Sequence, residues 1–221
     1  MSYDLKKRHS SLITHHSSLI TPMLHTRTAW IFDMDGTLTE SLHNFPAISR
    51  ALGLPEDEPI LEAIAKLPTE KAASIHRQLN DIELEIAKQA TPQPGAYELL
   101  DDLTSQGKQV GILTRNTKAI AHQTLSACGL AQFFHPDHIL GRSCCPPKPQ
   151  PDGILQLLST WSSAPTDAVM IGDHKFDLMA GRNANAIAVY LDPTGQFLWQ
   201  QYADYSVQTL RKLRQLTRFV K

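Results

Sequence analysis

Four short apolar runs in this chain each stop abruptly at polar residues, and this repeated pattern constrains the fold more than any other feature. The runs span residues 28–32, 109–113, 168–171 and 186–191. The polar residues that follow them are Asp33-Met34-Asp35-Gly36-Thr37, Thr114-Arg115-Asn116, Gly172-Asp173 and Asp192-Pro193. Short runs rich in β-branched and aromatic residues, bounded by such turns, are typical of strands.

Helical patterns lie between these predicted strands. They span residues 96–106, 117–128, 153–161 and 176–184. Asp152 stands at the predicted N-cap of the third helix. Strands that alternate with helices of this length predict an α/β fold with a doubly wound parallel sheet and right-handed crossovers. Ligands of such sheets bind outside the carboxyl ends of the strands, so we expect the functional site among the polar residues at that edge.

Residues 41–93 interrupt the alternation. This block contains no convincing strand, and its three helical patterns lie near residues 45–52, 58–67 and 69–90. It follows the turn at Asp35 and ends at Pro92-Gln93-Pro94-Gly95. The sequence therefore predicts an all-helical domain over 41–93, inserted into a core made of 26–40 and 94–221. The alternative is a set of ordinary helices that cover the sheet.

The first 25 residues differ from the rest of the chain. The six-letter word HSSLIT occurs at 9–14 and again at 16–21, which is low complexity. Two copies rich in Ser and Thr are too few for a coiled coil. We predict a flexible tail over 1–25, with Met23 as an alternative start of the chain. A metal-binding tail is the other interpretation, because four of these residues are histidines, namely His9, His15, His16 and His25.

Charge and cysteine content limit the partners. The 21 Lys and Arg residues nearly balance 22 Asp and Glu residues, and there is no long basic run. This composition argues against nucleic acid or an anionic membrane as a partner. Two of the three cysteines are adjacent, so we expect no disulfide framework. No run approaches the roughly 20 apolar residues of a membrane span. We expect a cytoplasmic monomer or weak homodimer that acts on a small soluble molecule.

Polar motifs fall at the predicted strand ends and in one loop beside them. They are DMDGT with Asp33 and Asp35, the strand-ending Thr114, KPQPD with Lys148, and GDHKFD with Asp173 and Asp177. In this order and spacing they resemble the haloacid dehalogenase superfamily, in its phosphoglycolate phosphatase-like branch with a helical cap after the first motif. The resemblance covers about residues 28–210. Each motif alone also describes an ordinary turn or loop, and the combination carries the resemblance.

These residue types suit phosphoryl transfer. A carboxylate fixed at the end of a buried strand is a nucleophile for phosphorus, so we expect Asp33 to form an aspartyl-phosphate. Asp35 faces the same cleft and can protonate the leaving group and then deprotonate water. Four carboxylates beside a phosphate require a hard cation. The resemblance implies Mg2+, with Asp33, the main-chain carbonyl of Asp35, and Asp173 as ligands, and Asp177 in support through water or Lys175.

Three residues are candidates to hold the phosphoryl oxygens. Thr114 supplies a hydroxyl, Arg115 follows it with main-chain N–H groups near the start of a helix, and Lys148 supplies a fixed positive charge. The alternative for Thr114 is a helix N-cap, and for Lys148 it is a solvated lysine. His174 lies inside the fourth motif and is either a cleft residue or a bystander.

The expected function is Mg2+-dependent hydrolysis of a small phosphorylated metabolite. Asp35 argues against a dehalogenase, because displacement of halide needs no general acid at that position. A phosphomutase of the same superfamily and a catalytically inactive binding module are the alternatives. The resemblance alone suggests phosphoglycolate-like and sugar phosphates as substrates, because the cap recognises the leaving group in this family.

Overall fold

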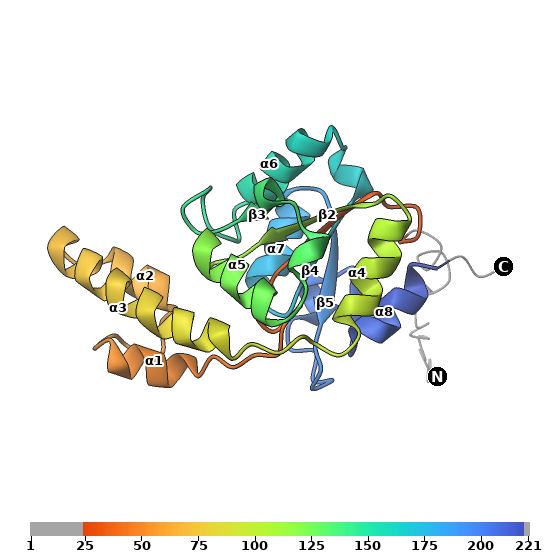
Figure 1. Cartoon of the computed structure of the whole chain (residues 1–221). Helices are drawn as coiled ribbons and strands as arrows, with labels where there is room; N and C mark the ends of the chain where they lie inside the picture. The colour runs from red at the N-terminus through yellow and green to blue at the C-terminus, as the bar shows by residue number, and fades with distance from the viewer. Residues whose placement is uncertain (1–23, 219–221) are drawn as a thin grey trace, which may run out of the picture.

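The computed structural model describes residues 24–218, and within them a parallel sheet forms the centre of the molecule (Figure 1). Its six strands have the order β3-β2-β1-β4-β5-β6. They are β1 (Ala29–Phe32), β2 (Gln109–Leu113), β3 (Ile139–Leu140), β4 (Ala168–Gly172), β5 (Ile187–Leu191) and β6 (Tyr205–Val207). All neighbouring pairs are parallel. The predicted doubly wound parallel sheet is confirmed, and β3 and β6 are strands that the four apolar runs do not include.

Helices cover both faces of the sheet because successive side chains of a strand point to opposite faces. Trp30 and Phe32 of β1 belong to one core cluster, and Ala29 and Ile31 belong to the other. The first cluster includes side chains of α4 (Ala96–Ser105), α5 (Lys118–Ala127) and α8 (Leu210–Leu216). The second includes side chains of α6 (Asp152–Trp161) and α7 (Lys175–Asn183).

Residues between β1 and α4 form a helical unit that lies beside the sheet, coloured orange to yellow in Figure 1. It contains α1 (Phe45–Ala51), α2 (Ile60–Ala65) and α3 (Thr69–Lys88). These helices share a hydrophobic cluster of their own, which includes Ile48, Ile64 and Leu79. Two chain segments connect the unit to the sheet, and they run side by side, with Glu40 N donating to Thr91 O at 2.9 Å. We refer to this unit as the cap.

Two details differ from the sequence-based expectations. Asp152 is the first residue of α6 rather than its N-cap, and Pro151 stands at the cap position without a side-chain hydrogen bond. Leu24 is fully buried in the core cluster, so the chain joins the core before residue 26. The repeated segment of the predicted tail, and Met23 itself, lie outside the described residues. No helix within residues 24–218 is both long enough and apolar enough to cross a membrane.

Candidate active site

The register of the central strands brings three motif residues to one edge of the sheet. Phe32 of β1 is paired with Ile112 of β2 and with Ile171 of β4. Each strand then continues by one or two residues into its polar turn, so Asp33, Thr114 and Asp173 emerge at neighbouring positions. The main-chain N–H of Asp33 still donates to the carbonyl of Ile171 at 2.8 Å, which fixes the start of the turn.

Glycines allow the acidic side chains to approach the backbone closely. Gly36 has a positive φ of 82°, and a Cβ atom at this position would overlap the carboxylate of Asp173. A Cβ atom at Gly172 would likewise overlap the side chain of Asp177. These two positions therefore explain why the DMDGT and GDHKFD motifs contain glycine beside their aspartates.

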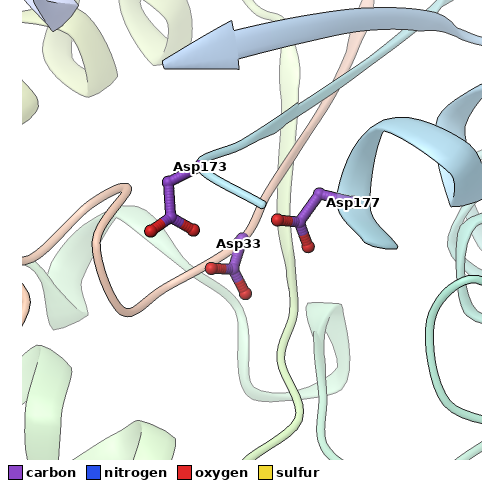
Figure 2. A group of neighbouring side chains, drawn as sticks. All are labelled: Asp33, Asp173 and Asp177. Carbon is purple, nitrogen blue, oxygen red and sulfur yellow. The ribbon is translucent and has the colours of Figure 1, made fainter. Parts of the chain in front are cut away.

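Asp33, Asp173 and Asp177 converge on one point (Figure 2). One carboxylate oxygen from each lies within 4.8 Å of the others. Asp33 follows β1, Asp173 follows β4, and Asp177 lies in the first turn of α7. The second oxygen of Asp177 accepts a hydrogen bond from the main-chain N–H of His174 at 3.0 Å, which holds the side chain in place. His174 also has a structural role, because its Nδ1 caps α7.

Lys148 is the cation at the centre of this acidic cluster. Its Nζ lies 2.5 Å from Asp33 Oδ1 and 2.6 Å from Asp177 Oδ1. Its side chain is only 2% exposed, so the interpretation as a solvated lysine is wrong. Burial lowers the pKa of Lys148, but Asp177 and Asp33 outweigh this effect and raise it above its ordinary value. The partner of Asp177 is thus Lys148; Lys175 instead lies with its Nζ 5.1 Å from the centre of the Trp199 ring.

One lysine does not neutralise three clustered carboxylates, of which Asp33 and Asp177 are buried. Burial raises the pKa of Asp33 to about 7, although Lys148 acts in the opposite direction. Burial and the charges of Asp33 and Asp177 raise the pKa of Asp173 well above its ordinary value. Clustered carboxylate oxygens with excess negative charge are the donor set of a hard divalent cation. The residues present therefore fit a bound metal ion.

Asp35 faces the same space from the other side of the turn. Asn116 Nδ2 donates to its Oδ2 at 2.7 Å, which orients the carboxyl group. Burial, and then the charge of Glu83, raise the pKa of Asp35 to about 7. A carboxyl group with such a pKa retains a proton near neutral pH and can act as a general acid.

Thr114 and Arg115 lie at the carboxyl end of β2. Thr114 is buried, and its hydroxyl oxygen accepts a hydrogen bond from the main-chain N–H of Asn116 at 3.1 Å. The N-cap of α5 is Thr117, so the interpretation of Thr114 as a helix N-cap is wrong. The guanidinium of Arg115 points toward the cap, where its NH2 group donates to both oxygens of Glu62 at 2.7 and 2.6 Å.

A cavity of about 430 Å³ lies between the acidic cluster and the cap. All seven sequence-predicted site residues line it, namely Asp33, Asp35, Thr114, Arg115, Lys148, Asp173 and Asp177. His174 lines it as well. The lining also includes residues that were not assigned from the sequence, among them His43, Glu83, Asn116 and Arg142. Asn116 and Arg142 follow β2 and β3, so the rule of polar residues at strand ends could have found them, whereas no such signal marks the two cap residues.

The chain belongs to the haloacid dehalogenase-like hydrolases, whose family description matches residues 30–190. It is 34% identical over 196 residues to an uncharacterized hydrolase of Saccharomyces cerevisiae, covering 85% of this chain and 89% of the relative. It is also 28% identical over 210 residues to the pyrophosphatase PpaX of Bacillus velezensis, covering 86% and 96% of the two chains.

Among solved structures, the fold is similar to that of a predicted phosphoglycolate phosphatase from Haemophilus somnus. The TM-score is 0.70 at 20% identity, with 87% of this chain and 99% of that chain covered. An inserted helical unit and acidic residues at the strand ends therefore occur here in a hydrolase of this family.

Proposed function

We propose that the protein is a Mg2+-dependent phosphatase that hydrolyses a small phosphorylated metabolite through an aspartyl-phosphate. The observation that carries the proposal is the position of Asp33, which is buried at the end of β1, in contact with Lys148, and open to the same cavity as Asp35. Membership of a hydrolase family and the similarity to the pyrophosphatase PpaX support phosphoryl chemistry.

In the first step the Asp33 carboxylate attacks phosphorus, and the bond between phosphorus and the leaving-group oxygen breaks. Asp35 donates its proton to that oxygen, so the alcohol leaves in neutral form. In the second step Asp35, now ionised, takes a proton from water, which attacks the aspartyl-phosphate and releases Asp33. The hydrogen bond from Asn116 keeps the Asp35 carboxyl group oriented in both steps.

Thr114, Lys148 and the main chain at Arg115 hold the phosphoryl oxygens in this proposal. Asp33, the carbonyl of Asp35, and Asp173 are the residues that would hold Mg2+. Both oxygens of Asp177 are already engaged by Lys148 and by the N–H of His174, so Asp177 positions the lysine. When bound, Mg2+ supplies positive charge to the phosphoryl oxygens and to the acidic cluster.

The proposal is tested with an aryl phosphate as substrate. Hydrolysis should require Mg2+ and stop with EDTA, and Asp33→Asn should lower kcat by several orders of magnitude, because the amide keeps the shape but is not a nucleophile. Rapid acid quench with a 32P-labelled substrate should trap labelled wild-type protein and no labelled variant. Undiminished turnover by the variant would exclude Asp33 as the nucleophile.

The metal site is tested separately with Asp173→Asn. Calorimetric titration should show weaker binding of Mg2+, and part of the lost activity should return at high Mg2+, because the variant lacks one charged ligand. Asp137→Asn is the matched control, since Asp137 is exposed and remote from the cavity lining. Unchanged Mg2+ affinity in Asp173→Asn would show that Asp173 is not a ligand.

A further inference from the structure

The cap supplies two side chains to the part of the cavity where the leaving group must lie. His43 lies on the segment that enters the cap, and Glu83 lies in α3. Their side chains are only 6% and 9% exposed, and both line the cavity. His43 Nδ1 is 3.8 Å from Asp35 Oδ1. Because Asp35 protonates the leaving-group oxygen in the proposed reaction, the next atoms of the alcohol come close to these two cap residues.

The Nδ1 atom of His43 has no hydrogen-bond partner within the described part of the chain. This atom is buried, and its distance to Asp35 is too long for a hydrogen bond. The ring is stacked on Phe45, with 5.4 Å between the centroids and an interplanar angle of 13°, so its orientation is fixed. A buried polar atom without a partner is energetically unfavourable. A hydroxyl group of a ligand can satisfy this nitrogen in either tautomer, because a hydroxyl both donates and accepts.

Glu83 presents a fixed negative charge to the same space. Arg142 holds its carboxylate with NH1 at 3.1 Å from Oε1 and NH2 at 2.9 Å from Oε2. NH1 also donates to the carbonyl of Arg115, and NH2 donates to Asn80 Oδ1. These bonds engage both terminal nitrogens of Arg142. The carboxylate keeps lone pairs that can accept hydrogen bonds from a ligand.

Among residues 24–218, a second anionic group on the substrate would find no unpaired Arg or Lys side chain in the cap-side lining of the cavity. Arg142 is paired with Glu83, and Arg115 is paired with Glu62. An anion would have to break one of these pairs and would then face the released carboxylate. The loop between α1 and α2 adds three acidic side chains to the lining, namely Glu56, Asp57 and Glu58. The cap side of the cavity is therefore matched to hydrogen-bond donors without negative charge.

We propose that His43 and Glu83 form the leaving-group subsite, and that this subsite selects the phosphate ester of a neutral polyhydroxy alcohol over one that carries a carboxylate or a second phosphate. A hydroxyl near the ester oxygen donates to Glu83, and a hydroxyl also pairs with His43 Nδ1. This inference rests on the proposed phosphatase function for the location of the leaving group.

Three phosphate esters of similar length test the selection. They are 2-hydroxyethyl phosphate, phosphoglycolate and phosphoethanolamine, which place a hydroxyl, a carboxylate and an ammonium group at the same end. Binding is measured by calorimetry with Mg2+ in the Asp33→Asn variant, so that no turnover is needed. The hydroxyl ligand should bind at least about tenfold more tightly than phosphoglycolate, because like charges repel in a buried site. Equal or tighter binding of phosphoglycolate, or tightest binding of phosphoethanolamine, would overturn the proposal.

Variants of the two cap residues test whether His43 and Glu83 cause the selectivity. Adding Glu83→Gln to Asp33→Asn should reduce the preference for the hydroxyl ligand over phosphoglycolate. Adding His43→Phe instead should lower the affinity for the hydroxyl ligand specifically, since Phe keeps the stacking on Phe45 but lacks the nitrogen. Glu85→Gln is the matched control, because Glu85 lies on the same helix and is 66% exposed. Thermal melting shows whether each variant is folded. An unchanged preference in both folded variants would exclude this subsite.

The two proposals fail in different ways. Absence of Mg2+-dependent aryl phosphate hydrolysis by the wild-type protein would refute the phosphatase function, since an aryl phosphate does not need the cap subsite. The order of the three binding constants is independent of turnover. A protein that hydrolyses the aryl phosphate but binds the three esters equally would retain the proposed function and lose the inferred selectivity.

Discussion

Lys148 Nζ lies 2.5 Å from Asp33 Oδ1, although the two residues are 115 positions apart in the chain. The contact is buried, and the same nitrogen lies 2.6 Å from Asp177 Oδ1. One lysine therefore compensates the charge of two largely buried carboxylates. This relationship makes Lys148 important for stability as well as for the proposed binding of the phosphoryl group.

Replacement of Lys148 by Met should destabilise the metal-free protein by about 3 kcal/mol, because removal of one partner leaves buried carboxylates without a counter-charge. Mg2+ should restore part of the loss by supplying charge to the same cluster. Urea unfolding with and without Mg2+ measures both effects. Lys71→Met is the control, since Lys71 is exposed on α3. Equal stability of the two variants would show that the Lys148 pairs contribute little.

The effect of Asp35→Asn on each of the two chemical steps should depend on the leaving group of the substrate. An alkyl phosphate needs the proton of Asp35, so its first step should slow by roughly 10²- to 10⁴-fold. An aryl phosphate with an acidic phenol leaves without this help, and the aspartyl-phosphate should accumulate because Asp35 no longer activates water. Paired rapid-quench experiments measure both rates and the labelled protein. Equal rate losses for both substrates, without a trapped intermediate, would show that another residue donates the proton to the leaving group.

The activity toward alkyl phosphates should fall as the pH rises through about 7. Burial and the charge of Glu83 raise the pKa of Asp35 to about 7, so the proton needed by the leaving group is present below this pH and lost above it. Glu83→Gln should move this limb of the pH profile to lower pH, because it removes the second cause of the raised pKa. The measurement is kcat/KM from pH 5 to 9. If kcat/KM falls at the same pH in the variant as in the wild-type protein, Glu83 does not raise the pKa of Asp35.

Asp102 joins two helices far from the cavity and offers a test of the fold itself. It lies in α4 and accepts hydrogen bonds from Arg214 Nε of α8 at 2.7 Å and from Arg218 Nε at 2.8 Å. The hydrogen bond from Arg214 is the main cause that lowers the pKa of Asp102 below its ordinary value.

Asp102→Asn should therefore lower the free energy of unfolding by about 1 kcal/mol at pH 7. Because the pKa is lowered in the folded state, the contribution of Asp102 is complete above its ordinary value of 3.8 and is lost as the pH falls below it. The difference in unfolding free energy between the wild-type protein and the variant should therefore shrink in urea unfolding as the pH falls below 3.8. Asp101→Asn, at an exposed neighbouring position, is the control. A difference that stays constant as the pH is lowered would contradict the electrostatic origin.

The amino-acid sequence by itself determined the four central strands of the sheet and the acidic side of the cavity. Apolar runs that end in polar turns predicted β1, β2, β4 and β5, and parallel strands necessarily bring their carboxyl ends to one edge. Asp33, Thr114 and Asp173 could therefore be assigned to one site before their contacts were known. The strand pattern alone does not define the position of the loop that contains KPQPD. Lys148 was therefore assigned from this motif.

The cap side of the cavity was decided only by the tertiary structure. The helical period of residues 69–88 predicts a buried face, but it does not say that Glu83 on this face meets Arg142, which lies 59 residues away. The contact depends on how the cap docks on the core, and that docking depends on the summed packing of several helices. For the same reason, no local pattern distinguishes His43 from a solvated histidine: its Nδ1 is buried only because the cap and the core close around it.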